Sequence, residues 1–458
     1  MLTYELKKSP GVPLYEALYR CIRADILSGN LKPGEKLPSK RALAQNLEVS
    51  KITVEAAYNQ LLSEGYVRAA EKIGYFVEDI PQTTIHTATL SPTSEEQPTA
   101  PVLDLTGSGT EKFPFSVWSK LQREVMLDYG EKLLLPLHNQ GIAPLRQAIA
   151  DHLRAFRAMN VDPNNILIGA GTDFLYNLLI QLLGRDKTYA VEDPGYGKIH
   201  RIYAAGGVAC VSVPMDHEGV RLDRLQNAQV LHLSPAHHFP TGLVTSVARR
   251  QELLAWAKNC GGYIIEDDYD SEFRFDAHPK PTMQCLDHSG RVIYMNTFSK
   301  SLAPSIRISY LVLPAELMAA FRKNLGFYSC TVSSFEQYTL ARFLSRGYFE
   351  KHINRMRKYY KMRRNQVVSA LNQCAFSDKL TIWEEDAGLH FLLKVRTAMT
   401  DEELVHYCES KGIRVRALSS YYHLNVPEED EHCLVINYAG LNQEDLEQCL
   451  ARWDGLPE

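Results

Sequence analysis

The sequence lacks several features that mark whole classes of protein. Its nine cysteines are scattered, and no two of them form a C-x-x-C pair, which argues against a disulfide framework and against a zinc site. No uninterrupted apolar run is long enough to span a bilayer, and the N-terminal stretch MLTYELKKSP has no apolar signal core. We therefore expect a cytoplasmic protein that holds no metal and makes no membrane contact.

A strong excess of positive charge is also missing, because the formal net charge is -4 over 458 residues. A globally basic surface is thereby excluded, so any signal for nucleic acid must be local. Apolar residues make up 45% and charged residues 23% of the chain, as in ordinary globular proteins with sizeable cores. The chain is long for one domain, so several are expected.

One segment divides the chain into a small and a large part. From Asp79 to Pro101 the sequence DIPQTTIHTATLSPTSEEQPTAP is rich in Thr, Ser and Pro and has no apolar periodicity, which is typical of an extended linker. We predict an N-terminal domain over 1–79, a linker over 80–101 and a large domain over 102–458.

The large part alternates strand-like and helical patterns. The runs NILIGA, TYAVED, VACVSV, VLHLS, GYIIED and RVIYMN read as buried strands between helices, which predicts an α/β fold with a mainly parallel sheet. From about Tyr310 long amphipathic helices take over, followed by the short strands GLHFLLKV and LVINYA. We expect a large lobe over about 130–310 and a smaller α/β lobe over about 311–458.

The N-terminal part reads as three helices and a β-hairpin. PLYEALYRCIRADILSG has apolar residues at helical spacing, and Ser39 and Ser50 are expected N-caps of two further short helices joined by a tight turn. YVRAAEKIGYFVED then predicts two strands around a turn near Gly74. This order describes a winged helix-turn-helix. Five cations cluster beside its second and third helices: Lys32, Lys36, Lys40, Arg41 and Lys51.

Two interpretations of this module stay open on charge alone: a DNA reader, or a docking domain with a solvated basic face. The ordered pattern from Pro13 to Val77, including GNLKPGEKLPSKRALA and VSKITVEAAY, resembles the GntR family of bacterial regulators. The resemblance implies that Ser39, Arg41 and Thr53 contact phosphates of double-stranded operator DNA, with Ser50 in the same set. It implies that Lys51, where the family usually has arginine, reaches base edges.

A lysine stands in an unusual setting in the large part. In NTFSKSLAPSIR, Lys300 follows the strand RVIYM and is surrounded by small, hydroxylic and turn-forming residues. A lysine there is either solvated or chemically useful. An amine in a partly desolvated site can form a Schiff base with an aldehyde, and pyridoxal 5'-phosphate (PLP) is the aldehyde cofactor that we consider.

PLP needs a carboxylate for its ring nitrogen, amides and a cation for its phosphate, and a flat side chain beside its ring. The sequence offers candidates for each need. They are Asp267 for the ring nitrogen, Tyr269 for the phenolic oxygen, Gly171, Thr172 and Asp173 at a helix N-terminus with Thr297, Ser299 and Arg307 for the phosphate region, and Tyr196 for stacking.

Taken singly, these residues have ordinary structural interpretations as caps, turns and packing. Their order, with the P-T-G turn at Pro240–Gly242 and the motifs EDDYDSEFR and TFSKSLAPSIR, resembles the PLP-dependent aminotransferases of fold type I. A GntR-like reader joined to such a domain resembles the MocR-type regulators, which include the GabR and PdxR groups. That resemblance implies a head-to-tail homodimer and a PLP-binding sensor. Such regulators control genes for vitamin B6 synthesis, amino-acid use or transport, in response to PLP, an amino acid or an amine.

One departure bears on the effector. In CLVINYAGL, Leu434 stands where the aminotransferase pattern has an arginine that grips a substrate carboxylate. The candidates for a replacement cation are Arg416, Arg414 and Lys198. We therefore expect a sensor rather than an enzyme. A working aminotransferase with a DNA-binding appendage and a scaffold with two interaction domains remain as alternatives.

Overall fold

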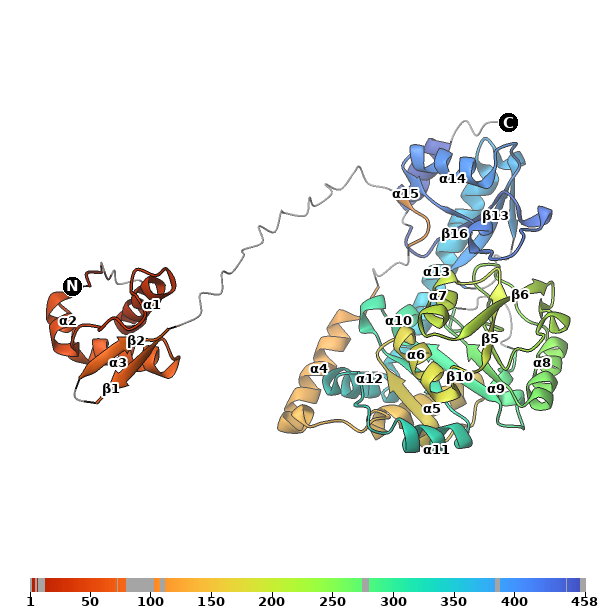
Figure 1. Ribbon diagram of the computed structural model, residues 1–458. Helices are drawn as coiled ribbons and strands as arrows, with labels where there is room; N and C mark the ends of the chain where they lie inside the picture. Colours follow the sequence, from red (N-terminus) through yellow and green to blue (C-terminus); the bar gives the residue numbers. More distant parts are fainter. Residues whose placement is uncertain are drawn as a thin grey trace. The chain divides into compact units, whose positions relative to one another are not determined.

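The computed structural model describes residues 2–4, 6, 13–71, 73–79, 103–107, 112–273, 280–383, 388–441 and 443–453. The chain forms two compact units, Met1–Gln97 and Pro98–Glu458 (Figure 1). The predicted linker over 80–101 lies outside the described residues, as does Arg274 of the EDDYDSEFR motif.

The first unit is a three-helix module with a two-stranded wing. Its elements are α1 (Leu14–Leu27), α2 (Lys40–Asn46), α3 (Lys51–Ser63), β1 (Val67–Ala70) and β2 (Gly74–Val77), with β1 and β2 antiparallel. The predicted caps are confirmed, because the Ser39 side chain accepts from the Ala42 amide at 3.2 Å and that of Ser50 from the Thr53 amide at 3.0 Å. Apolar side chains at helical spacing on α1 and α3 form the core of the module. The expected winged helix-turn-helix is confirmed.

The second unit is built on an eight-stranded sheet in the order β4-β11-β10-β9-β8-β5-β6-β7. These strands are β4 (Ile166–Gly169), β5 (Thr188–Asp193), β6 (Ala209–Asp216), β7 (Gly219–Val220), β8 (Val230–Leu233), β9 (Tyr263–Asp267), β10 (Val292–Thr297) and β11 (Ser309–Val312). The pairs β5·β6, β5·β8, β8·β9 and β9·β10 are parallel, whereas β11 runs antiparallel between β4 and β10. The mainly parallel sheet is therefore as expected.

Helices cover both faces of this sheet (Figure 1). They are α4 (Phe115–Tyr129), α5 (Ala143–Arg157), α6 (Thr172–Leu183), α7 (Gly197–Ala205), α8 (Val247–Cys260), α9 (Met283–Leu286), α10 (Phe298–Ser301), α11 (Ala315–Asn324) and α12 (Ser334–Ser345). Alternate residues of β10 divide between the two sides: Ile293 and Met295 pack with α6, α7 and α11, whereas Tyr294 joins the core that holds α4, α5 and α12. Two apolar layers thus enclose the sheet, as strand alternation requires.

The smaller lobe carries a four-stranded antiparallel sheet in the order β12-β13-β16-β15. Its elements are α13 (Tyr348–Gln373), β12 (Leu380–Trp383), β13 (His390–Val395), α14 (Asp401–Ser410), β14 (Ile413–Arg414), β15 (Arg416–Ala417), β16 (Cys433–Asn437) and α15 (Gln443–Trp453). β3 (Leu103–Asp104) pairs in parallel with β14, so residues that directly follow the predicted linker join this lobe.

The boundary between the two lobes lies later in the sequence than the expected position near residue 310. β11 belongs to the large sheet, α11 packs on α6, and α12 packs on α4 and α5. The large lobe therefore continues through α12, and α13 leads into the smaller lobe. The amphipathic pattern after residue 310 marks helices that cover the large sheet, and it does not mark the start of the smaller lobe. None of the described helices is both long enough and apolar enough to cross a membrane.

Candidate functional site

A cavity of about 470 Å³ lies where the parallel strands β5, β8, β9 and β10 end. Polar side chains at the ends of parallel strands meet at one edge of a sheet, which is the usual ligand position in open α/β folds. The cavity is lined by eleven of the predicted residues: Thr172, Asp173, Tyr196, Lys198, Asp267, Tyr269, Thr297, Ser299, Lys300, Arg307 and Arg416. The structure thus brings together positions spread over almost 250 residues of sequence.

Asp267 ends β9 inside this cavity and is only 4% exposed. Its Oδ2 accepts from the Tyr176 hydroxyl at 2.7 Å and lies 3.5 Å from His232 Nε2. His232 is oriented in turn by the Tyr203 hydroxyl, 2.7 Å from its Nδ1. Oδ1 of Asp267 has no hydrogen-bond partner among the described residues. A buried carboxylate with one oxygen held and the other unpaired suits a cationic N–H donor such as a pyridinium.

Lys300 lies in α10, directly after β10. The turn into α10 is capped by Thr297, whose hydroxyl accepts from the Ser299 amide at 3.1 Å. Burial lowers the pKa of Lys300, although the negative charge of Asp270 opposes this shift. A lowered pKa enlarges the fraction of neutral amine near pH 7, and the neutral amine is the form that reacts with an aldehyde.

Tyr269 follows Asp267 by two residues and lines the same cavity. Burial raises the pKa of its phenol well above the usual value, and the neighbouring carboxylates add to the shift. Its hydroxyl lies 3.4 Å from His237 Nδ1, and His237 pairs with Asp270 at 2.8 Å. Tyr269 therefore stays protonated and can donate a hydrogen bond into the cavity.

The phosphate end of the predicted site is built by the start of α6 and by Arg307. Gly171 precedes α6 with φ +86°, and a Cβ at this position would lie 2.4 Å from Arg307 Nη2, so only glycine fits. Arg307 Nη2 and Lys198 Nζ lie 3.3 Å and 2.8 Å from Asp173 Oδ2. Burial acts to raise the pKa of Asp173, but these two cations outweigh it and lower the pKa. Helix amides beside a guanidinium form an anion site.

Of the three candidate cations for the effector, Arg416 and Lys198 line the cavity and Arg414 does not. Arg416 lines the cavity and lies opposite Val435 in the antiparallel β15·β16 pair, so the two side chains share one face of the sheet. Burial raises the pKa of Tyr421 in the cavity wall, an effect that the Arg416 guanidinium reduces. Arg414 instead lies on β14, with Nη1 3.3 Å from Asp104 Oδ2, and does not line the cavity.

The alternation of side chains along β16 corrects the prediction that Leu434 stands at the position of the carboxylate-binding arginine. Leu434 packs into the main core, whereas Val435 joins the apolar cluster of Leu392, Leu418 and Tyr421, and Asn437 lines the cavity. Because alternate residues face the same side, Val435 is the position directed to the cavity. The conclusion that no arginine stands on this face of β16 is unchanged, since valine cannot bind a carboxylate.

Several cavity residues were missed by the sequence analysis. Tyr176, which hydrogen-bonds Asp267, and His232, which lies 3.5 Å from it, belong to no local motif. His200 and His423 line the cavity with their rings stacked 4.5 Å apart. Burial lowers the pKa of His200, and His423 adds to the shift. The one local signal was helical spacing, which places Tyr176 one turn after Thr172 and on the same side of α6.

The predicted DNA-contact residues gather at the starts of α2 and α3. Ser39, Arg41, Ser50 and Lys51 are exposed and Thr53 is half-buried. Lys40, one of the five clustered cations, has Nζ 2.7 Å from a Glu55 oxygen and 5.2 Å from the centre of the Tyr75 ring. It therefore ties α2 to α3 and the wing.

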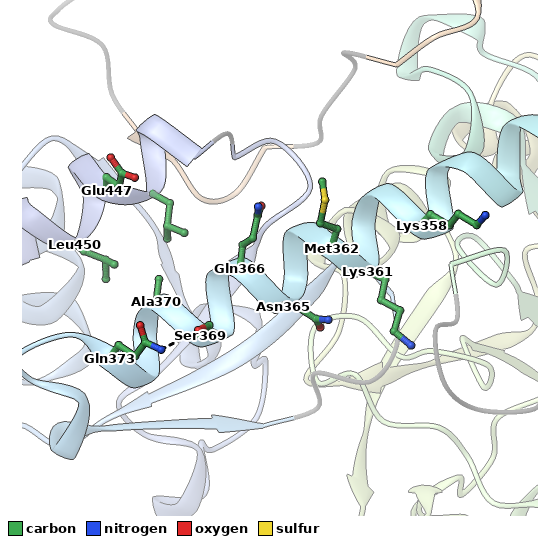
Figure 2. A pocket seen from close by; sticks show the side chains of 11 residues that line it. Lys358, Lys361, Met362, Asn365, Gln366, Ser369, Ala370, Gln373, Glu447 and Leu450 are labelled. Carbon is green, nitrogen blue, oxygen red and sulfur yellow. Dashed lines mark hydrogen bonds between the residues drawn. The ribbon is translucent and has the colours of Figure 1, made fainter.

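A second hollow of about 730 Å³ lies on the smaller lobe between α13 and α15 (Figure 2). Its polar lining consists of lysine amines, amides, a hydroxyl and the Glu447 carboxylate. It shares no lining residue with the first cavity. No set of three metal-ligating side chains occurs in the part of the chain that the structure describes. The first cavity is the candidate ligand site because it gathers the eleven predicted residues, whereas the second hollow contains none of them.

Comparison with known proteins agrees with this division. Residues 14–77 match the family described as bacterial regulatory proteins, gntR family, and residues 105–452 match aminotransferase class I and II. The chain is 35% identical to an uncharacterized HTH-type transcriptional regulator of Bacillus subtilis, YdeL, over 98% of this chain and 97% of that protein. It is 32% identical to a probable rhizopine catabolism regulatory protein of Rhizobium meliloti, MocR, over 97% and 93%.

Among solved structures, a kynurenine aminotransferase of Pyrococcus horikoshii superposes with a TM-score of 0.67 at 24% identity, covering 77% of this chain and 90% of that one. At this identity the likeness shows the fold alone. Together with the sheet order and the HTH module, these matches confirm the predicted fold class.

Proposed function

The chain belongs to the bacterial regulators in which a GntR-type helix-turn-helix domain is joined to an aminotransferase class I and II domain, and we propose that its large unit binds PLP through Lys300. In this proposal a small molecule, either PLP itself or an amino acid or amine, changes the affinity of the reader for double-stranded operator DNA in the cytoplasm. The observation that carries the proposal is the unpaired Asp267 Oδ1 in one cavity with Lys300 and Arg307.

The cavity residues fit the cofactor group by group. When bound, PLP would supply an aldehyde that condenses with an amine, with loss of water, and the conjugated product absorbs visible light. Asp267 Oδ1 would accept a hydrogen bond from the protonated ring nitrogen, while Tyr176 keeps the carboxylate in place. The α6 amides after Gly171, with Arg307, would bind the phosphate. Tyr269 would donate to the ring oxygen and Tyr196 would stack on the ring, while Thr297 and Ser299 shape the turn that presents Lys300.

Regulation requires a difference in affinity between two arrangements of the protein, because a ligand shifts an equilibrium only by its differential binding. We propose a head-to-tail homodimer as the regulated assembly. Supporting it, large apolar side chains are exposed along α4, the 3-10 turn η1 (Gly130–Leu134) and the segment after α11: Phe115, Leu127, Leu134, Leu135 and Phe327. Large exposed apolar side chains are common at subunit interfaces, and they support the assembly of two chains.

The test uses the full-length chain and a duplex that it selects from a random DNA library. PLP is titrated while the visible spectrum and the Kd for the duplex are recorded, and a panel of amino acids and amines follows. We expect a visible band to form with PLP, and at least one compound to change the Kd without release of a keto acid. If no visible band forms, the cofactor proposal is wrong. Steady release of a keto acid would favour the aminotransferase alternative.

A second expectation concerns Arg416 as the cation for a carboxylate of the effector. Replacing Arg416 with glutamine removes a charge-assisted hydrogen bond, which is ordinarily worth 1.5–3 kcal/mol or roughly 10- to 150-fold in affinity. We expect the concentration of carboxylate effector that gives half-maximal change in Kd to rise by that factor. The effect of PLP alone is expected to stay unchanged.

Arg414→Gln is the matched control, because Arg414 is the same residue type two positions away and pairs with Asp104 outside the cavity. An equal loss in both variants would mean that Arg416 acts only through the stability of the lobe. No loss in Arg416→Gln would reassign the carboxylate to Lys198.

A further inference from the structure

The first two turns of α3 carry two apolar side chains, Ile52 and Ala56, outside the side of the helix that packs in the module. Ile52, the second residue of α3, is 77% exposed, and Ala56, one turn later, is half-buried. The core side of the helix is formed by other residues, namely Val54, Ala57, Tyr58 and Leu61. Ile52 thus lies outside the stripe that packs the module together.

The hydroxyl and carboxylate groups near Ile52 make contacts within the module. The hydroxyls of Ser50 and Thr53 lie 2.8 Å apart, and Ser50 Oγ caps the helix. The carboxylate of Glu55 is held by Lys40 at 2.7 Å. The outward side of the helix start therefore offers the Lys51 amine next to the apolar surface of Ile52 and Ala56.

Isolated exposed apolar residues are common on protein surfaces. At this position, however, neither packing nor helix formation accounts for isoleucine, because β-branched side chains form helices less readily than Lys, Glu or Ala. The N-terminal residues of the second helix of a helix-turn-helix are the ones that approach base edges in the major groove. There the thymine C5-methyl is the one apolar group that a base pair displays.

We propose that Ile52 determines operator specificity by packing against a thymine methyl in the major groove, beside a base contacted by Lys51. This inference rests on the proposed DNA-reading function. Beyond that function, the inference specifies the DNA partner as a duplex that carries thymine at a fixed position in the site bound by each reader. The contact adds apolar burial and shape selectivity, whereas phosphate contacts carry no sequence information.

The test removes the methyl group from the DNA rather than from the protein. The full-length wild-type chain first selects a duplex from a random library. The Kd of the protein is then measured by fluorescence anisotropy for that duplex and for a second duplex of the same sequence in which deoxyuridine replaces every thymine. Burial of one methyl ordinarily changes affinity about fourfold, so we expect at least a fourfold weaker Kd for the deoxyuridine duplex.

The variants assign the effect to one side chain. Ile52→Ala is expected to bind the thymine duplex about fourfold more weakly and to give the same Kd for both duplexes, whereas Ile52→Val keeps the preference. Lys51→Ala weakens both complexes and leaves their ratio unchanged. Lower salt strengthens phosphate contacts and keeps the weaker complexes measurable.

The possible failures are distinguishable. A wild-type chain that enriches no duplex contradicts the proposed function itself. A wild-type chain that selects a duplex but binds both versions equally overturns only the role of the methyl. A preference for thymine that survives unchanged in Ile52→Ala assigns the methyl to another residue or to DNA shape, and the inference is then wrong.

Discussion

Replacing Lys300 with alanine is expected to abolish the visible band on PLP addition and to remove the ligand response, while some DNA binding remains. In the proposed function Lys300 supplies the amine for the aldehyde, whereas the reader is a separate compact unit with its own core. The measurements are the absorption titration and the Kd for a selected duplex with and without effector. This is one of the two largest effects that we expect, because a covalent attachment is lost completely.

The matched control is Lys323→Ala, which removes an exposed lysine from α11. It is expected to keep both the band and the response. A ligand response that persists in Lys300→Ala would contradict the sensor proposal, and a band that persists would place the reactive amine elsewhere.

The pH dependence of band formation offers an independent check on Lys300. Burial lowers the pKa of its amine, and only the neutral amine attacks the aldehyde. The initial rate in wild-type protein should therefore rise with pH and level off below the value near 10.4 that an ordinary lysine requires. A rate that still climbs through pH 10 would show that Lys300 titrates like a solvated lysine.

Replacing Asp267 with asparagine is expected to weaken PLP binding by roughly 30- to 5000-fold, because the variant leaves the protonated ring nitrogen buried without a charged partner. Asparagine keeps an oxygen that accepts from the Tyr176 hydroxyl, so the cavity should remain folded. The checks are the PLP affinity from the absorption titration and the thermal unfolding of the protein without PLP.

Tyr176→Phe is the graded control for this carboxylate. It removes one hydrogen bond to Asp267 Oδ2 but leaves the charge, so a loss of about three- to tenfold is expected. Equal losses in the two variants would show that the position of the carboxylate matters and its charge does not. Unchanged PLP affinity in Asp267→Asn would remove Asp267 from the site.

Features encoded over a few neighbouring residues were predicted from the sequence. The caps at Ser39 and Ser50, the runs that became β5, β9 and β10, and the lysine after β10 each depend on local chemistry or on a short period. These signals were enough for the strand and helix pattern of the sheet and for eleven of the residues that line the cavity.

Features that depend on contacts distant in sequence were not predictable in this way. Tyr176 reaches Asp267 across 91 positions, and β11 enters the sheet antiparallel between β4 and β10. Leu434 was assigned to the cavity because alignment to a motif does not determine strand parity, and one residue of shift turns a side chain to the opposite face.

The sequence by itself therefore determined the two kinds of domain, the elements of the sheet and the amine, acid and glycine that suit one cofactor, because each is written in adjacent or periodic residues. The tertiary structure alone decided which cations face the cavity. Arg416 does so because its strand pairs with β16 opposite Val435, whereas Arg414, two residues earlier, turns to Asp104. Pairing between strands distant in sequence sets that choice, and no local pattern of residues specifies it.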